Sequence, residues 1–137
     1  MNLNEIIEHS TTHNREVEFV NPAGERTGWF FELRPENSPE VQEVMSRHRS
    51  KIQDLMLKRK NNAVKQANRE HERVLIMSHV AGWRWEKGED DKKGRPAFSK
   101  QELKRLLTLD LFGVILTKFI DNETGALEDF IGKSESS

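Results

Sequence analysis

The 137-residue chain contains no cysteine, only four prolines, and no long apolar run. Without cysteine it has neither a disulfide framework nor a thiolate for metal binding or nucleophilic catalysis. No window approaches the roughly 18 consecutive apolar residues that a membrane span requires. The first ten residues, MNLNEIIEHS, lack the basic and apolar regions of a secretory signal. These absences predict a soluble cytosolic protein.

Large apolar residues are scarce as well. Leucine, isoleucine, valine and phenylalanine together supply 34 of the 137 residues, whereas charged residues make up 33% of the chain. About a quarter of large apolar residues lies only a little above the roughly 20% below which chains stay disordered. The composition therefore predicts a thin core, or one that another subunit completes.

Sequence motifs of enzymes and cofactor sites are also missing. The chain has no G-x-S-x-G, no phosphate-binding P-loop and no G-x-G-x-x-G. His9 and His13 have the i, i+4 spacing of two metal ligands, but no matching third ligand is evident. We therefore expect no catalytic residues, no metal and no cofactor, and interpret the chain as a non-enzyme.

Residues 1–36 are expected to form a short helix and a β-hairpin. Val17 and Phe19 alternate with glutamates, and the following Asn-Pro-Ala-Gly has the residue preferences of a type I turn. A second alternating stretch places Trp29, Phe31 and Leu33 on one face. Period-two alternation on both sides of a turn is typical of a hairpin.

A long helix is expected to follow over residues 39–81, either continuous or broken near residue 61. It begins with Ser38-Pro39, a capping side chain followed by proline at the first helical position. An unbroken helix of this length would measure roughly 60 Å, more than the diameter of a small domain. Its apolar stripe is therefore predicted to mediate self-association or client contact, and consists of Val41, Val44, Met45, Ile52, Leu55 and Met56.

Three shorter helices are predicted after a charged loop, over residues 99–107, 109–121 and 124–131. Ser99 and Glu102 form an S-x-x-E capping box at the start of the first. Trp83 and Trp85, before the loop, are either possible interface anchors or core residues that pin the loop. The fold class is thus mainly α with a small N-terminal β-hairpin (α+β), and residues 37–132 form the helical domain. Residues 133–137 are expected to be a disordered tail.

Charge is balanced overall and uneven locally. The net charge is −1, but residues 46–73 carry nine Lys or Arg against three acids, so that the remainder has a net charge of −7. A segment of +6 is either a footprint for phosphate or a solvated helical face. The basic face is predicted at Arg47, Arg49, Lys51, Lys58, Arg59 and Lys60.

The chain resembles, over most of its length, the tail assembly chaperones of long-tailed, siphovirus-type bacteriophages, and the resemblance is clearest in residues 74–131. The resemblance lies in the order of its short motifs: Val80-Ala81-Gly82-Trp83, then Gly94-x-Pro96-x-Phe98-Ser99, Leu103-x-x-Leu106-Leu107 and Ile115-x-x-x-Phe119-Ile120. The earlier Thr27-Gly28-Trp29 is compatible with the same family.

This resemblance implies a viral protein that acts in virion assembly. It implies a chaperone that binds the tape measure protein, keeps it soluble and helps recruit the major tail protein. Such a chaperone works in the host cytoplasm and is not part of the mature virion. Many members are made in a second, longer form by ribosomal frameshifting, and Gly132-Lys133 is compatible with a slippery codon string. The resemblance supplies no catalytic residues.

Two other functions remain open at this point. The chain is alternatively a small helical nucleic-acid-associated protein that uses basic segment 46–73, or an unrelated oligomeric helical scaffold. Because the basic segment contains no interleaved aromatic residue, nucleic acid is the less favoured partner. A homo-oligomer is expected in either the chaperone or the scaffold case, and no membrane partner is expected.

Overall fold

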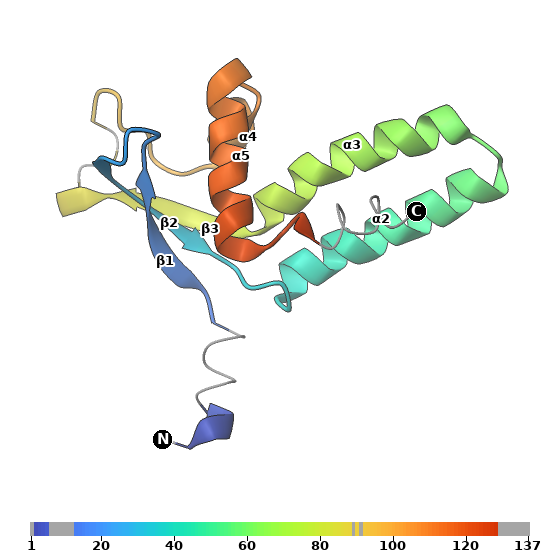
Figure 1. The fold of residues 1–137 in the computed structure, drawn as a ribbon, viewed down its shortest axis with the longest axis horizontal. Coiled ribbons are helices and arrows are strands. Elements are labelled where there is room, and N and C mark those ends of the chain that lie inside the picture. Colours follow the sequence, from blue (N-terminus) through green and yellow to red (C-terminus); the bar gives the residue numbers. More distant parts are fainter. Residues whose placement is uncertain (1, 6–12, 89, 91, 129–137) are drawn as a thin grey trace.

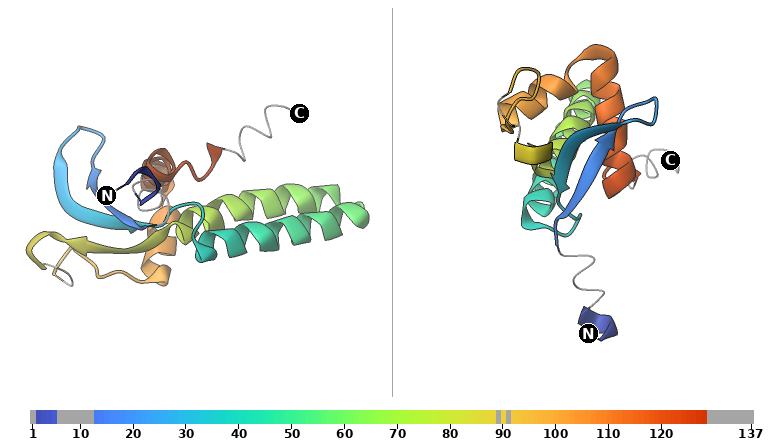
Figure 2. Two further views of the ribbon diagram at one scale, coloured as in Figure 1. Left: turned by 90° about the horizontal axis from the view of Figure 1, so that it is seen from below. Right: turned by 90° about the vertical axis from the view of Figure 1, so that its left-hand side faces the viewer.

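The computed structural model describes residues 2–5, 13–88, 90 and 92–128. It consists of a small body, built from a three-stranded sheet and two helices, and an arm of two long helices that projects from it (Figures 1 and 2). The mainly α fold with a β-hairpin near the N-terminus is therefore confirmed in outline. Residues 133–137, predicted to be a disordered tail, lie outside the described residues.

The predicted hairpin is present and forms part of a larger sheet. Strands β1 (Arg15–Val20) and β2 (Arg26–Leu33) pair antiparallel, and Val17 lies opposite Phe31. The turn between them is closed by a 2.8 Å hydrogen bond from the amide of Gly24 to the carbonyl of Asn21. As predicted, Trp29, Phe31 and Leu33 share a buried face.

The third strand, β3 (Val80–Trp85), pairs antiparallel with β2. The expectation that the long helix reaches Ala81 is therefore wrong, because helix α3 ends at Ser78 and the backbone becomes extended at Val80. Since β3 comes from the predicted helical domain 37–132, that segment and the N-terminal hairpin share one sheet in the order β1-β2-β3.

The predicted break in the long helix occurs at residues 58–60. Helix α2 (Pro39–Leu57) and helix α3 (Asn61–Ser78) fold back on each other, so the 60 Å continuous form is wrong. Arg59 has φ +55°, which is a left-handed conformation that stops the helix. Ser38 precedes α2 as predicted, but its hydroxyl makes no capping hydrogen bond and is buried without a partner.

Helices α4 (Lys100–Leu107) and α5 (Asp110–Thr124) complete the body. The capping box of α4 is confirmed, since the amide of Glu102 donates to Ser99 Oγ at 3.0 Å. Helix α5 is longer than predicted, because Thr124 still belongs to it and Gly125 ends it with φ +69°. The helix predicted over 124–131 consequently cannot begin at Thr124, and residues 129–131 lie outside the described part.

The core lies between the inner face of the sheet and α5. Phe19 packs edge-on against Phe112 and Phe119 of α5, with ring centroids 6.0 and 5.1 Å apart. Trp29 stacks on Trp85 with centroids 5.0 Å apart. Because aromatic side chains bury a large apolar area each, they compensate for the small number of aliphatic residues. The core has few aliphatic residues, as the composition predicted, and aromatic side chains of the same chain fill much of it.

Candidate interaction surfaces

The apolar stripe of α2 lies mostly inside the molecule. Val41 is fully buried, and Val44 and Met45 pack against the core. Ile52 and Leu55, farther along the arm, are half-buried. They lie four and seven residues after His48, which stacks on His71 of α3, so helical periodicity places them on the side of α2 that faces α3. The prediction that this stripe is not buried within one monomer is wrong for Val41, whereas the role of the stripe in self-association or client contact stays a prediction.

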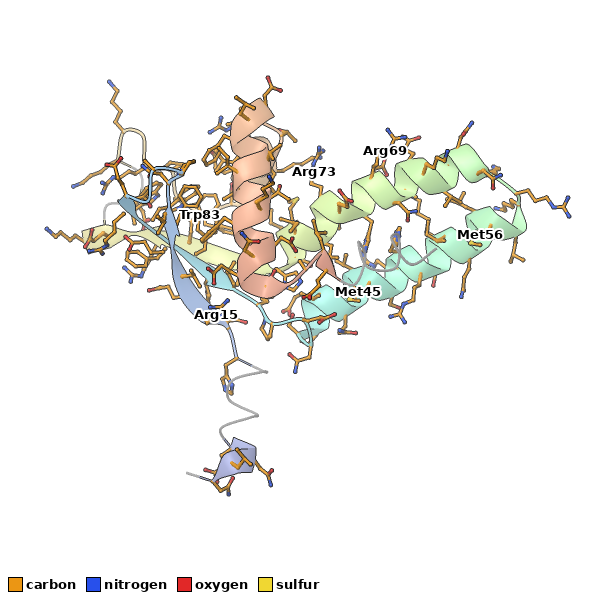
Figure 3. All side chains as sticks on the ribbon, viewed as in Figure 1. Arg15, Met45, Met56, Arg69, Arg73 and Trp83 are labelled. Carbon is orange, nitrogen blue, oxygen red and sulfur yellow. The ribbon has the colours of Figure 1, made fainter. Side chains whose placement is uncertain are left out.

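At the tip of the arm, two neighbouring apolar side chains are exposed to solvent. Met56, the last residue of the predicted stripe, is 62% exposed, and Leu57 beside it is 85% exposed. They directly precede the turn at residues 58–60 (Figure 3, where Met56 is labelled). The end of the stripe, Met56, and its neighbour Leu57 thus form an exposed surface, which we call the apolar tip.

A pair of stacked imidazoles occupies the middle of the arm. The rings of His48 on α2 and His71 on α3 are parallel, with centroids 3.7 Å apart, and His48 Nε2 lies 2.9 Å from Asn68 Oδ1. Burial, together with the neighbouring His48, lowers the pKa of His71 to about 4. Burial also lowers the pKa of His48. Both rings are thus neutral at pH 7 and serve as packing groups between the two helices.

Helix α5 carries an exposed apolar ridge that the sequence did not single out. Its inner face is buried through Leu116 and Ile120, whereas Leu111 and Val114 on the opposite side are 81% and 55% exposed. Leu109, which precedes the helix, is also exposed. Residues three apart lie on one side of a helix, so Leu111 and Val114 form one surface, which we call the α5 ridge.

The α5 ridge could be anticipated in part from the sequence. Apolar residues cover nearly the whole circumference of this helix, which predicts either a central position or an oligomer contact. The structure places one side of the helix against the sheet and leaves the other side exposed. Exposed apolar residues that occur singly are ordinary, but neighbouring ones point to an interaction site.

The six residues of the predicted basic face do not share one face. Arg47 pairs with Glu43, Lys58 Nζ lies 3.0 Å from Asp54, and Lys51 Nζ lies 3.9 Å from Glu70. At 100° per residue, Arg49 projects about 160° away from Arg47 around α2. Arg59 and Lys60 belong to the turn at the tip. This prediction grouped residues that are close in sequence but not in direction.

A second group of basic residues lies on α3, and its members share one side of the helix. Lys65, Arg69 and Arg73 follow one another at intervals of four residues and are all exposed. Figure 3 shows Arg69 and Arg73 on the side of α3 that faces away from α2. We call these three residues the α3 cation row. The i, i+4 spacing in the sequence was the signal that could have identified them.

Trp83 and Trp85 are core residues of this chain. Of the two roles considered for them, the structure therefore shows the one in the core. Both indoles are buried, and both Nε1 groups donate to the carbonyl of Pro96 at 2.9 Å. The ring of Trp83 also packs edge-on against Phe98, with centroids 4.9 Å apart. The two tryptophans thus pin the charged loop to the sheet ahead of α4. Any contact with another chain remains a prediction.

Chemical sites are sparse in the part of the chain that the structure describes. In that part, no three histidine, aspartate or glutamate side chains lie close enough together to hold a metal ion. His9, one member of the His9–His13 pair, lies outside it. Within the same residues, no helix is both long enough and apolar enough to cross a membrane. The α5 ridge, the apolar tip and the α3 cation row are therefore the candidate functional surfaces.

Comparisons with known proteins add no family to this description. Neither a protein-family model, nor a curated protein, nor a solved structure matches the chain.

Proposed function

We propose that the protein is a non-enzymatic tail assembly chaperone of a long-tailed bacteriophage. It binds the tape measure protein, keeps it soluble in the host cytoplasm and helps recruit the major tail protein, the latter through a longer, frameshifted form. It is absent from the mature virion. The proposal starts from the resemblance in the segment 74–131, which forms the end of α3, β3, α4 and α5.

The α5 ridge is the observation that carries the proposal. A helical client exposes apolar side chains at intervals of three and four residues, and such helices bind to apolar surfaces of matching spacing. Leu111 and Val114 present this spacing and lie in the segment that resembles the chaperone family. Lys118, one turn farther along the same face, is exposed and keeps the surface hydrated.

The apolar tip provides a second contact for the same client or for another copy of the chain. Methionine adapts its unbranched side chain to partners of different shape, and Met56 is exposed next to Leu57. The tip lies at the far end of the arm, away from α5, which belongs to the body (Figure 2). A long helical client, or a homo-oligomer, can engage both surfaces at once.

Co-expression with the tape measure protein tests the function. The wild-type chain should move the tape measure protein into the soluble fraction and co-purify with it. The ridge variant, Leu111→Ser with Val114→Ser, should fail to do so. Lys118→Ser with Asn122→Ser is the matched control, because it changes two exposed residues on the same face of α5. This control should behave like the wild type.

The possible results distinguish a failure of the proposed chaperone function from a failure of the α5 ridge as its binding surface. A wild-type chain that leaves the tape measure protein insoluble refutes the proposed function. A ridge variant that solubilises it as well as the control does would leave the chaperone role standing and exclude the α5 ridge as its binding surface. Exposed substitutions usually change stability by no more than about 0.5 kcal/mol, so both variants should fold.

A further inference from the structure

The α3 cation row runs along the side of α3 that faces away from α2 (Figure 3). Ala67, His71 and Leu75 are the buried residues of α3 that face inward. At 100° per residue, Lys65, Arg69 and Arg73 project to the opposite side. Successive members are about 6 Å apart along the helix axis. The row is therefore a line of three exposed positive charges that turns by about 40° around the helix at each step.

These three cations are not neutralised by ion pairs. Within the described residues, Lys65, Arg69 and Arg73 form no salt bridge, whereas Arg47, Lys51 and Lys58 on α2 each pair with an acid. Among the described residues, no lysine or arginine of α3 is thus paired, whereas Arg47, Lys51 and Lys58 are; Arg49 on α2 also has no salt bridge. An unpaired set is free to bind an anionic ligand without first breaking an internal ion pair.

The surroundings of the row consist of hydrogen-bonding groups. A shallow hollow on α3 is lined by Lys65 and Arg69 together with Asn62, Gln66 and Glu70. The carboxylate of Glu70 is engaged, since it accepts from Gln66 Nε2 at 3.3 Å and lies 3.9 Å from Lys51 Nζ. The hollow has no apolar lining residue, so it offers nothing to the apolar face of a helical client.

The chemistry favours a phosphodiester backbone over an acidic protein segment. Exposed ion pairs between proteins contribute only about 0–1 kcal/mol each, so an acidic helix needs apolar contacts that this surface lacks. A nucleic-acid backbone binds through charge alone, because each neutralised phosphate releases condensed counterions. Lysine, arginine, asparagine and glutamine are the side chains that commonly contact phosphates.

We propose that the α3 cation row binds the backbone of double-stranded nucleic acid without sequence specificity. A duplex is favoured over a single strand because the row includes no aromatic side chain on which bases could stack. The site is separate from the α5 ridge, and the proposal does not depend on the chaperone function. The net charge of −7 outside residues 46–73 does not prevent binding, since the row lies on the projecting arm (Figure 1).

Fluorescence anisotropy with a labelled 20-base-pair DNA duplex of random sequence tests the proposal. Three phosphate contacts predict a slope of about −2.7 for log K against log salt, which is about a 40-fold loss of affinity between 50 and 200 mM salt. The full-length wild-type chain is compared with the row variant, Lys65→Ala, Arg69→Ala and Arg73→Ala. The control variant, Lys100→Ala, Lys104→Ala and Lys118→Ala, has the same net charge but loses exposed cations of α4 and α5.

The row variant should bind at least tenfold more weakly than the wild type at 50 mM salt, and the control within threefold of it. Far-UV circular dichroism verifies that both variants are folded. The proposal is overturned if the wild type does not bind at 50 mM salt, or if the two variants lose affinity equally. It is also overturned if polyglutamate competes as well as an unlabelled duplex, since the row would then be a general anion surface.

Discussion

Replacing His71 with phenylalanine should remove much of the pH dependence of this protein's stability between pH 7.5 and pH 5. His71 is only 8% exposed and stacks on His48, and this environment lowers its pKa to about 4. In the unfolded chain a histidine has its ordinary pKa of about 6.5. As the pH falls through 6.5, the unfolded chain therefore gains a proton that the folded chain does not bind.

The magnitude follows from linkage. Stability falls as the pH decreases wherever the unfolded state binds more protons. With pKa values of 6.5 and about 4, His71 alone lowers the free energy of unfolding by about 2 kcal/mol between pH 7.5 and pH 5. The stabilisation is fully present above pH 6.5 and is lost progressively below it.

Urea unfolding at pH 7.5 and pH 5 measures the effect. The quantity compared is the loss of unfolding free energy between the two pH values, in wild type and in His71→Phe. Phenylalanine keeps an aromatic ring against His48, and contacts that do not titrate cancel in the comparison. The variant should lose about 2 kcal/mol less than the wild type. Equal losses in the two proteins would refute the reasoning that a buried, neutral His71 couples the arm to pH.

Three further changes have defined expectations. Gly113→Ala should destabilise the body by about 2–3 kcal/mol in urea unfolding, because a Cβ there would lie 2.3 Å from the backbone carbonyl oxygen of Leu107; an unchanged midpoint would show that α4 and α5 shift freely. Arg59→Gly should raise stability by about 0.5 kcal/mol, because glycine adopts the left-handed φ of +55° without steric cost, and a lower midpoint would contradict this. Met56→Ser with Leu57→Ser should weaken tape measure protein binding in pull-downs, with thermal stability unchanged. The matched pair Gln53→Ser and Asn61→Ser should bind normally, and a tip variant that binds equally well would exclude the tip.

Local signals in the sequence predicted the elements that depend on neighbouring residues. The alternation around Trp29 and Phe31 gave the hairpin strands, and the Ser99–Glu102 capping box gave the start of α4. The start of α2 at Pro39 was also correct, although Ser38 makes no capping bond. Each of these elements depends on a turn or a helix cap formed by residues close in sequence, so its pattern can be recognised in the sequence itself.

Non-local pairing explains what the sequence did not predict. Strand β3 pairs with β2, some fifty residues earlier, and the alternation of Trp83 and Trp85 alone did not identify that partner. The arm turns at Arg59, an arginine in a conformation that usually marks glycine or asparagine. Once α3 folds back over α2, the predicted apolar stripe becomes internal packing and the exposed apolar surface is found on α5 instead.

Site-specific photocrosslinking tests most directly the central claim, that the α5 ridge holds the tape measure protein. A p-benzoylphenylalanine residue at position 111 reports contacts of the ridge, and the same residue at position 32 reports the exposed outer face of the sheet. In cells that co-express the tape measure protein, position 111 should give an adduct with it and position 32 should not. Adducts from both positions alike, from neither, or from position 111 only to another copy of this chain would contradict the claim.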